Sequence, residues 1–265
     1  MTGSFRWLTA LLLACGLSAC GGDDRSSTAE DRSAQGRVVK GVLQGAQVSA
    51  YAFDDQRQPS RFLATTLTDD QGYFFFPELP AELVRLVVEA APDGSSTMLC
   101  DAASGCGDGI AFGQAMSLPE GFQLISLLPA DRPQGSVAVT PLTHIAALWA
   151  EQFPLGVTDQ AATLALSQVA EVFGMDADFA WQTPIDVTDP IEVSAAGSAA
   201  LAHGFLAAGF AQLSGGVDAQ QVIAEYVQAF IDNGGQLPVG QGSGNLQSLA
   251  EAAAAVAQQF ADGGI

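Results

Sequence analysis

The two histidines, His144 and His203, are the side chains best suited to acid–base or metal chemistry near neutral pH. A zinc peptidase would hold its metal with two histidines four residues apart on a helix, in the pattern H-E-x-x-H. Neither histidine lies in that pattern, because I-A-A follows His144 and G-F-L follows His203. We therefore expect His203 to be a hydrogen-bonded core residue of a helix, and His144 to be partly exposed near a helix start.

Nucleophiles and carboxylates give no stronger indication of catalysis. Ser243 lies in the sequence G-Q-G-S-G, where Gln241 stands at the first glycine position of a serine-hydrolase elbow and no strand precedes it. Asp176 and Asp178 begin like a calcium loop, but Trp181 stands where that loop needs glycine. Paired carboxylates of a glycosidase cannot be recognised without geometry. The sequence thus predicts no catalytic residue, no metal site and no cofactor, and leaves a carboxylate-based hydrolase as an alternative.

The start of the chain is typical of an export signal. Arg6 precedes an apolar run over residues 8–17, and the segment L-S-A-C ends at Cys20 with small residues before it. This pattern resembles the lipobox of bacterial lipoproteins, in which the signal, here residues 1–19, is removed and the cysteine receives lipid. The resemblance implies a lipid-anchored envelope protein, and Gly21 in place of aspartate implies sorting to the outer membrane. An ordinary secretory signal is the alternative.

The charge balance excludes one class of partner. Acidic residues outnumber basic residues by 29 to 9, which gives a formal net charge of -20. Binding to nucleic acid needs a cluster of Lys and Arg against the phosphates, and the sequence has none. Anionic lipid headgroups are disfavoured for the same reason. Besides the membrane that holds the lipid anchor, we expect an envelope protein or a glycan as the partner.

Export also determines how the remaining cysteines are interpreted. One cysteine would leave with the signal and Cys20 would carry lipid, which leaves Cys100 and Cys106 in a loop rich in glycine and aspartate. In an oxidising envelope their spacing predicts a disulfide, and closing so short a loop stabilises a fold by roughly 2 kcal/mol. A metal site is the alternative, but two thiolates fall short of four ligands. We expect Asp101 and Asp108 to be solvated turn residues rather than calcium ligands.

The region before residue 140 predicts a tether followed by strands. Residues 20–36 lack large apolar side chains, which favours a solvated, disordered tether. After it, short runs of β-branched and aromatic residues alternate with turn residues, which is typical of a small antiparallel sandwich. The expected strands cover residues 38–42, 47–53, 62–68, 73–76, 83–89, 122–128 and 137–139.

Part of this region, roughly residues 36–92, resembles the carboxypeptidase regulatory-like domain. The segments G-R-V-V-K-G (36–41) and G-A-Q-V (45–48), followed by T-D-D-Q-G-Y-F-F (68–75), carry the resemblance. It implies a prealbumin-like, seven-stranded sandwich that serves as a spacer, a docking surface or occasionally a carbohydrate contact. The resemblance is nearly silent about function.

Aromatic side chains suggest where such a sandwich could bind. The run Y-F-F-F at residues 73–76 predicts alternating burial in the core, with an outward ring between buried ones. Exposed rings can stack on sugars. Tyr51, Tyr73 and Phe75 are therefore the candidates for a glycan-binding surface.

From Thr140 onward the periodicity is helical. Thr140 and Pro141 suit the N-cap and first position of a helix, and Thr158 and Asp218 suit the caps of two later helices. The segment 191–213 is rich in Ala and Gly and nearly uncharged. It is long enough to span a bilayer, but its small residues favour a central buried helix. With a last helix before the C-terminus, the pattern indicates about five helices.

The sequence therefore predicts an α+β chain of two modules, an antiparallel β-sandwich over residues 37–139 and an all-α helical domain over residues 140–265. We expect a lipid-anchored envelope protein with a non-catalytic binding, adhesion or scaffolding role. A glycan-binding surface lipoprotein is the main alternative, and a carboxylate-based envelope hydrolase is less favoured.

Overall fold

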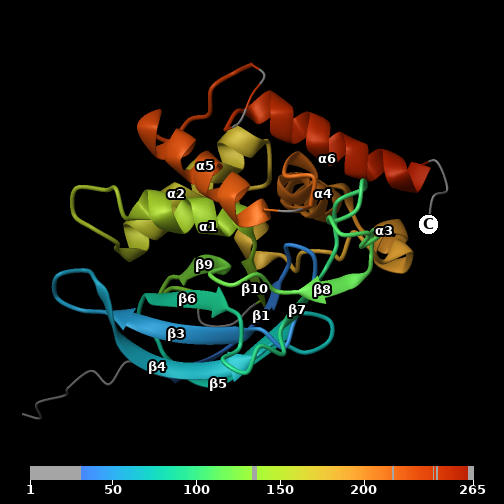
Figure 1. Cartoon of the computed structure of the whole chain (residues 1–265). Coiled ribbons are helices and arrows are strands. Elements are labelled where there is room, and N and C mark those ends of the chain that lie inside the picture. The colour runs from blue at the N-terminus through green and yellow to red at the C-terminus, as the bar shows by residue number, and fades with distance from the viewer. Residues whose placement is uncertain (1–30, 133–135, 217, 241, 243, 262–265) are drawn as a thin grey trace, which may run out of the picture.

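A computed structural model of the chain describes residues 31–132, 136–216, 218–240, 242 and 244–261. The predicted signal peptide, Cys20 and the first part of the predicted tether lie outside the described residues. Strands come first and helices follow, which confirms the predicted α+β class (Figure 1). The strands are β1 (Asp31–Val38), β2 (Leu43–Gln44), β3 (Gln47–Phe53), β4 (Pro59–Leu67), β5 (Tyr73–Pro80), β6 (Val84–Glu89), β7 (Thr97–Leu99), β8 (Ala115–Ser117), β9 (Gln123–Leu128) and β10 (Ser136–Val139). The helices are α1 (Pro141–Ala150), α2 (Asp159–Phe173), the 3-10 turn η1 (Phe179–Trp181), α3 (Pro190–Ala195), α4 (Ser198–Leu213), α5 (Ala219–Asp232) and α6 (Leu246–Ala261).

The described strands form three sheets. Their orders are β10-β1-β5, β4-β3-β6-β9 and β2-β7-β8. The prediction of an antiparallel sandwich is wrong for one pairing, because β1 and β10 run parallel. β10 is the last strand before the helices, and its run beside β1 carries the chain directly into α1.

Strand β1 corrects the predicted tether, because it begins at Asp31 rather than after residue 36. Arg32 and Ala34 point into the fold and are buried. The guanidinium of Arg32 donates hydrogen bonds to four backbone carbonyls of neighbouring segments. A segment without large apolar side chains is thus ordered by one buried cation and by pairing with β5. Its composition alone does not predict this order.

The small sheet β2-β7-β8 has no counterpart among the predicted strands. Its strands contain two or three residues each, which is too short for a period-two pattern to appear. This sheet holds the chain that leads directly into Cys100.

Helix starts follow the predicted caps. The Thr140 hydroxyl accepts a hydrogen bond from the Thr143 N–H, and Thr143 accepts one from the Thr140 N–H, so the two residues form a capping box. Thr158 caps α2, which ends at Gly174 with a φ of 65°. Asp218 caps α5 through the N–H of the third helical residue.

The helix predicted over residues 191–213 is in fact two helices, α3 and α4, separated by Ala196 and Gly197. Glycine is a poor helix former, and Gly197 stands at the N-cap of α4. Helix α4 is the buried helix that its small residues predict, since a Cβ at Gly209 would lie 2.9 Å from Cδ1 of Leu249 in α6. Among the described residues, no helix has both the length and the apolar character needed to cross a membrane.

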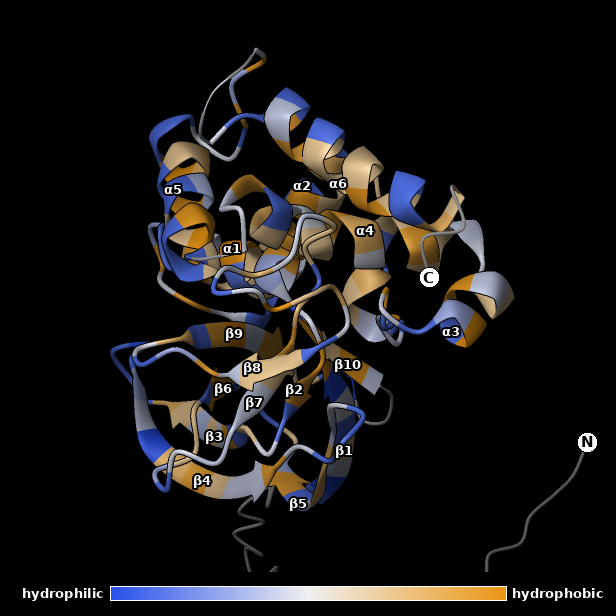
Figure 2. Ribbon diagram, turned by 45° about the vertical axis from the view of Figure 1, so that its right-hand side comes forward, coloured by the Kyte–Doolittle hydropathy of each residue, from blue (hydrophilic) through white to orange (hydrophobic). Residues whose placement is uncertain are grey.

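Strands and helices share one apolar core. Phe76 of β5 and Leu124 of β9 belong to the same buried cluster as Leu142 of α1 and Phe230 of α5. The helices lie together on one side of the strands, with α1 directly against β9 (Figure 2). The two predicted modules therefore pack into one body, and the helical module can contribute side chains to sites on the β module.

Candidate functional site

An open groove of about 610 Å³ lies over the outer face of β1 and β5, beside the turn between β4 and β5. Three large apolar side chains are exposed along it, Leu67, Tyr73 and Phe75, with exposed fractions of 56%, 38% and 53%. Polar side chains complete the wall: Gln35, Thr66, Asp69, Ser136 and Thr183. Exposed rings beside a few convergent polar groups make this groove the candidate binding site.

The strand register explains why these side chains meet. In β5, the exposed Tyr73 and Phe75 alternate with two buried phenylalanines, because successive side chains of a strand point to opposite faces. Phe75 pairs with Gln35 of β1, and Gln35 pairs with Ser136 of β10. The floor of the groove is therefore a continuous cross-strand row on three paired strands.

The next cross-strand row is covered by the helical module. Arg37 pairs with Tyr73 in register, and its guanidinium lies 4.8 Å from the centroid of the Tyr73 ring. Its two terminal nitrogens donate to the Glu192 carboxylate at 2.6 and 2.9 Å, and one also donates to the Pro184 carbonyl at 3.1 Å. Burial opposes the Arg37 charge, but Glu192, Tyr73 and Asp186 outweigh it and raise the Arg37 pKa.

The segment between η1 and α3 forms one rim of the groove. Thr183 and Ser136 join their hydroxyls at 3.1 Å, which links this segment to β10. Asp186 accepts hydrogen bonds from the N–H and the hydroxyl of Thr188, and its own N–H donates to Glu192 at 2.9 Å. Burial raises the pKa of Asp186 although these donors oppose the shift. The rim is thus held by internal bonds before any ligand arrives.

The third predicted aromatic, Tyr51, does not line this groove. It lies on β3 in the other large sheet, where its ring meets Phe62 edge-on with 5.8 Å between centroids. Tyr51 also packs against the main core. The structure therefore brings Tyr73 and Phe75 together and places Tyr51 apart from them.

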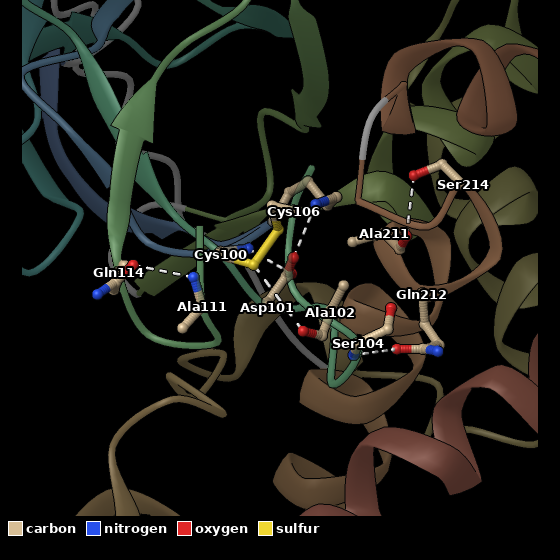
Figure 3. The surroundings of a disulfide bond; sticks show 12 residues. Cys100, Asp101, Ala102, Ser104, Cys106, Ala111, Gln114, Ala211, Gln212 and Ser214 are labelled. Carbon is tan, nitrogen blue, oxygen red and sulfur yellow. Dashed lines mark hydrogen bonds and ion pairs between the residues drawn. A yellow bond between two sulfur atoms is a disulfide. The ribbon is translucent and has the colours of Figure 1, made fainter. Parts of the chain in front are cut away.

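The structure contains the predicted disulfide between Cys100 and Cys106, and both cysteines are buried (Figure 3). The loop rests on the end of α4, where the Ser104 N–H donates to the side-chain carbonyl of Gln212 at 3.3 Å. A Cβ at Gly216 would lie 2.3 Å from Cα of Cys106, so the loop and the chain after α4 are in direct backbone contact. The disulfide thus closes a loop of the β module that packs against the end of α4.

The two aspartates of this loop differ from each other. Asp108 is exposed, as expected for a solvated turn residue. The same expectation is wrong for Asp101, which is buried and forms an ion pair with Lys40 at 2.9 Å. The sequence gives no local sign of this pair, because its members lie sixty-one positions apart.

His203 is the hydrogen-bonded core residue that we expect, since its Nε2 lies 3.0 Å from the Thr140 hydroxyl. The expectation for His144 is wrong: it is buried, because the first turns of α1 pack against β9, and its Nδ1 has no hydrogen-bond partner among the residues that the structure describes. Burial lowers the pKa of each histidine to about 4, with a further contribution from Arg85 at His144. Neither imidazole lines the groove.

The groove offers little for hydrolysis. Among the described residues that line it, Asp69 is the one carboxylate, whereas glycoside hydrolysis of the usual kind needs two facing carboxyl groups. Within the part of the chain that the structure describes, no group of three or more His, Cys, Asp and Glu could hold a metal ion. The arrangement can bind and orient a ligand through stacking and hydrogen bonds.

Tyr73 and Phe75 were predicted as candidates for a binding surface, whereas their neighbours in the groove were not. Gln35 and Ser136 reach the groove only through the register of β1 with β5 and β10. Thr183 comes from a segment that follows two helices. No local sequence pattern predicts these long-range contacts. The sequence indicates only that uncharged polar residues occupy outward positions of adjacent strands.

No family model, no curated protein and no solved structure matches this chain.

Proposed function

We propose that this chain is a lipid-anchored protein of the cell envelope, held at the outer membrane through Cys20, with a non-catalytic binding role. The lipobox-like segment supports the anchor. The proposal includes kinship of the β module with the carboxypeptidase regulatory-like domain. A three-stranded and a four-stranded sheet around one core support it, since that family has a seven-stranded sandwich.

The binding site in this proposal is the groove over β1 and β5. The observation that carries it is the pair of exposed rings, Tyr73 and Phe75, fixed on one paired strand. Rings that are already ordered lose little conformational entropy when a ligand binds. Because the groove is open at the surface, it suits a chain-like ligand lying across the strands.

A neutral saccharide is the ligand class that this lining favours. A pyranose ring has an apolar C–H face that can stack on an aromatic ring, and hydroxyls that bond to side chains such as Gln35 and Ser136. The net charge of -20 and the nearby Asp69 disfavour a polyanionic glycan. The same net negative charge does not disfavour the binding of neutral sugars.

Affinity electrophoresis tests this function. The purified protein is run through gels that contain xylan, galactomannan or β-glucan, alongside the variants Tyr73→Ala and Phe75→Ala. We expect at least one polysaccharide to retard the protein, and each variant to weaken retention by about tenfold, the loss of one stacked ring. Phe62→Ala is the matched control, because Phe62 is equally exposed but lies outside the groove.

Two results would contradict the proposal. If none of the polysaccharides retards the protein, the ligand class is wrong. If retention survives in both groove variants, the saccharide binds elsewhere and the groove is not the site.

The anchor is tested separately with Cys20→Ser in cells fed an alkyne-labelled palmitate. We expect the unmodified sequence to acquire the label and fractionate with the outer membrane, and the variant to lose both properties. Labelling that persists in the variant would place the lipid on another residue.

A further inference from the structure

Lys40 is the only lysine of the chain, and its side chain has no exposed surface. Lysine normally extends its ammonium into solvent even when its methylene stem is buried. Lys40 instead points inward from the segment that follows β1, toward Asp101 beside the disulfide. Asp101 is 1% exposed. The Lys40 ammonium and the Asp101 carboxylate, two groups that are normally solvated, are thus buried next to each other.

Both carboxylate oxygens of Asp101 accept a hydrogen bond, whereas the Lys40 ammonium has fewer acceptors than donors in the part of the chain that the structure describes. Lys40 Nζ lies 2.9 Å from Oδ1 of Asp101, and the Gly41 N–H donates to Oδ2 at 2.5 Å. An ammonium has three N–H donors, and among the described residues Asp101 supplies the one acceptor for Nζ. A charged lysine would therefore keep two buried donors unsatisfied, which is costly in an apolar interior.

We propose that Lys40 and Asp101 condense to an isopeptide bond that crosslinks the chain between these residues. This inference is independent of the proposed binding function. A proton first passes from the ammonium to Oδ1, which leaves a neutral amine and a carboxylic acid. The Nζ lone pair then attacks Cγ, and the Gly41 N–H stabilises the negative charge that develops on Oδ2. Oδ1 takes the second proton from the nitrogen and leaves as water, so that a C–N bond replaces a C–O bond.

Three features of the surroundings favour this condensation. Burial raises the pKa of Asp101, although Lys40 and Gly41 oppose the shift, and so favours the protonated acid. The fold holds amine and acid in contact, which gives the high effective concentration of an intramolecular reaction. Residues adjacent to the pair, Val39, Val42 and Cys100, are also buried, so water for the reverse hydrolysis is excluded.

The bond would reinforce the disulfide. The Cys100–Cys106 loop rests on α4, and Asp101 lies between the two cysteines. An amide to Lys40 would join this loop covalently to the end of β1, so that one sheet strand and the loop at α4 become parts of a single crosslinked unit.

Peptide mapping of the mature protein purified from cells, reduced and denatured, tests the inference. Trypsin and Glu-C together should release residues 38–57 joined to residues 90–120, with a mass about 18 Da below the sum of the two peptides, the loss of one water. Trypsin does not cut at an acylated lysine, so peptides 38–40 and 41–57 should be missing. An N-hydroxysuccinimide ester added to the denatured protein should leave Lys40 unlabelled.

Two variants distinguish this bond from other dehydrations. Lys40→Arg lacks the nucleophile and should show no mass deficit, whereas an aspartyl succinimide at Asp101 would persist in it. Asp101→Asn should still condense, with loss of ammonia and a deficit of about 17 Da. Recovery of free peptides 38–40 and 41–57 from the unmodified sequence, with full labelling of Lys40, would overturn the proposal.

Discussion

The guanidinium of Arg37 lies over the ring of Tyr73, 4.8 Å from its centroid, on neighbouring strands of one sheet. Cation–π contacts of this kind fix the orientation of the ring. Since Glu192 at α3 holds the same guanidinium, the helical module controls the position of an aromatic side chain in the groove.

Glu192→Ala should lower the free energy of unfolding by about 2 kcal/mol, because a buried guanidinium loses its carboxylate while Glu192 itself is partly solvated. Urea titration measures this loss. Glu82→Ala, which removes the partner of the exposed Arg61, is the control and should cost less than about 1 kcal/mol. Equal costs in the two variants would show that burial of Arg37 has no energetic consequence.

Arg32→Ala should destabilise the protein by about 3 kcal/mol, because four backbone carbonyls, two of them at Leu128 and Pro129, lose their donor. The neighbouring Ser33 is exposed, so Ser33→Ala should change stability by less than about 0.5 kcal/mol. Thermal unfolding of both variants provides the measurement. If Arg32→Ala leaves the stability unchanged, residues 31–36 behave as the tether that their composition predicts.

Replacing both Cys100 and Cys106 with serine should lower stability by about 2 kcal/mol through loop entropy. It should also speed hydrogen exchange at the end of α4, because the loop contacts Gln212 and Gly216. Ser104→Ala keeps the backbone bond to Gln212 and serves as the control. Unchanged exchange at α4 in the double variant would show that the loop does not brace that helix.

Acid should destabilise the fold through the buried histidines. Their folded-state pKa of about 4 lies below the value near 6.5 of an unfolded chain, so the unfolded state binds more protons between these values. The stabilisation is complete above about pH 6.5 and is lost as the pH falls toward 4, by about 3 kcal/mol for each histidine.

Unfolding midpoints measured from pH 7 to pH 4 test this expectation. His144→Leu removes one titrating group whose Nδ1 has no partner in the described part of the chain, so it should reduce the pH dependence while changing stability at pH 7 by less than about 1.5 kcal/mol. An unaltered pH profile in His144→Leu would assign the acid sensitivity to other groups.

Local patterns predicted those parts of the fold that local physics determines. Threonine and aspartate caps at Thr140, Thr158 and Asp218 marked helix starts, because the cap satisfies N–H groups of the adjacent turn. The start of β1 depended instead on carbonyls about one hundred residues away from Arg32. Such contacts leave no periodic signal in the sequence.

The same distinction applies to the site. The alternation in residues 73–76 predicted one outward ring between buried ones, whereas the structure exposes both Tyr73 and Phe75. The ion pairs of Arg37 with Glu192 and of Lys40 with Asp101 were not predictable, since each joins distant segments and each member looks like an ordinary surface charge in isolation.

Calorimetric titration of an oligosaccharide of the best-retained polysaccharide into the unmodified protein, Tyr73→Ala and Phe62→Ala compares the contribution of a ring in the groove with that of an exposed ring outside it. If the groove is the binding site, Tyr73→Ala should weaken the affinity by about tenfold, and Phe62→Ala should leave it within about twofold. Equal affinities for the two variants, or a larger loss in Phe62→Ala, would contradict a binding site in the groove.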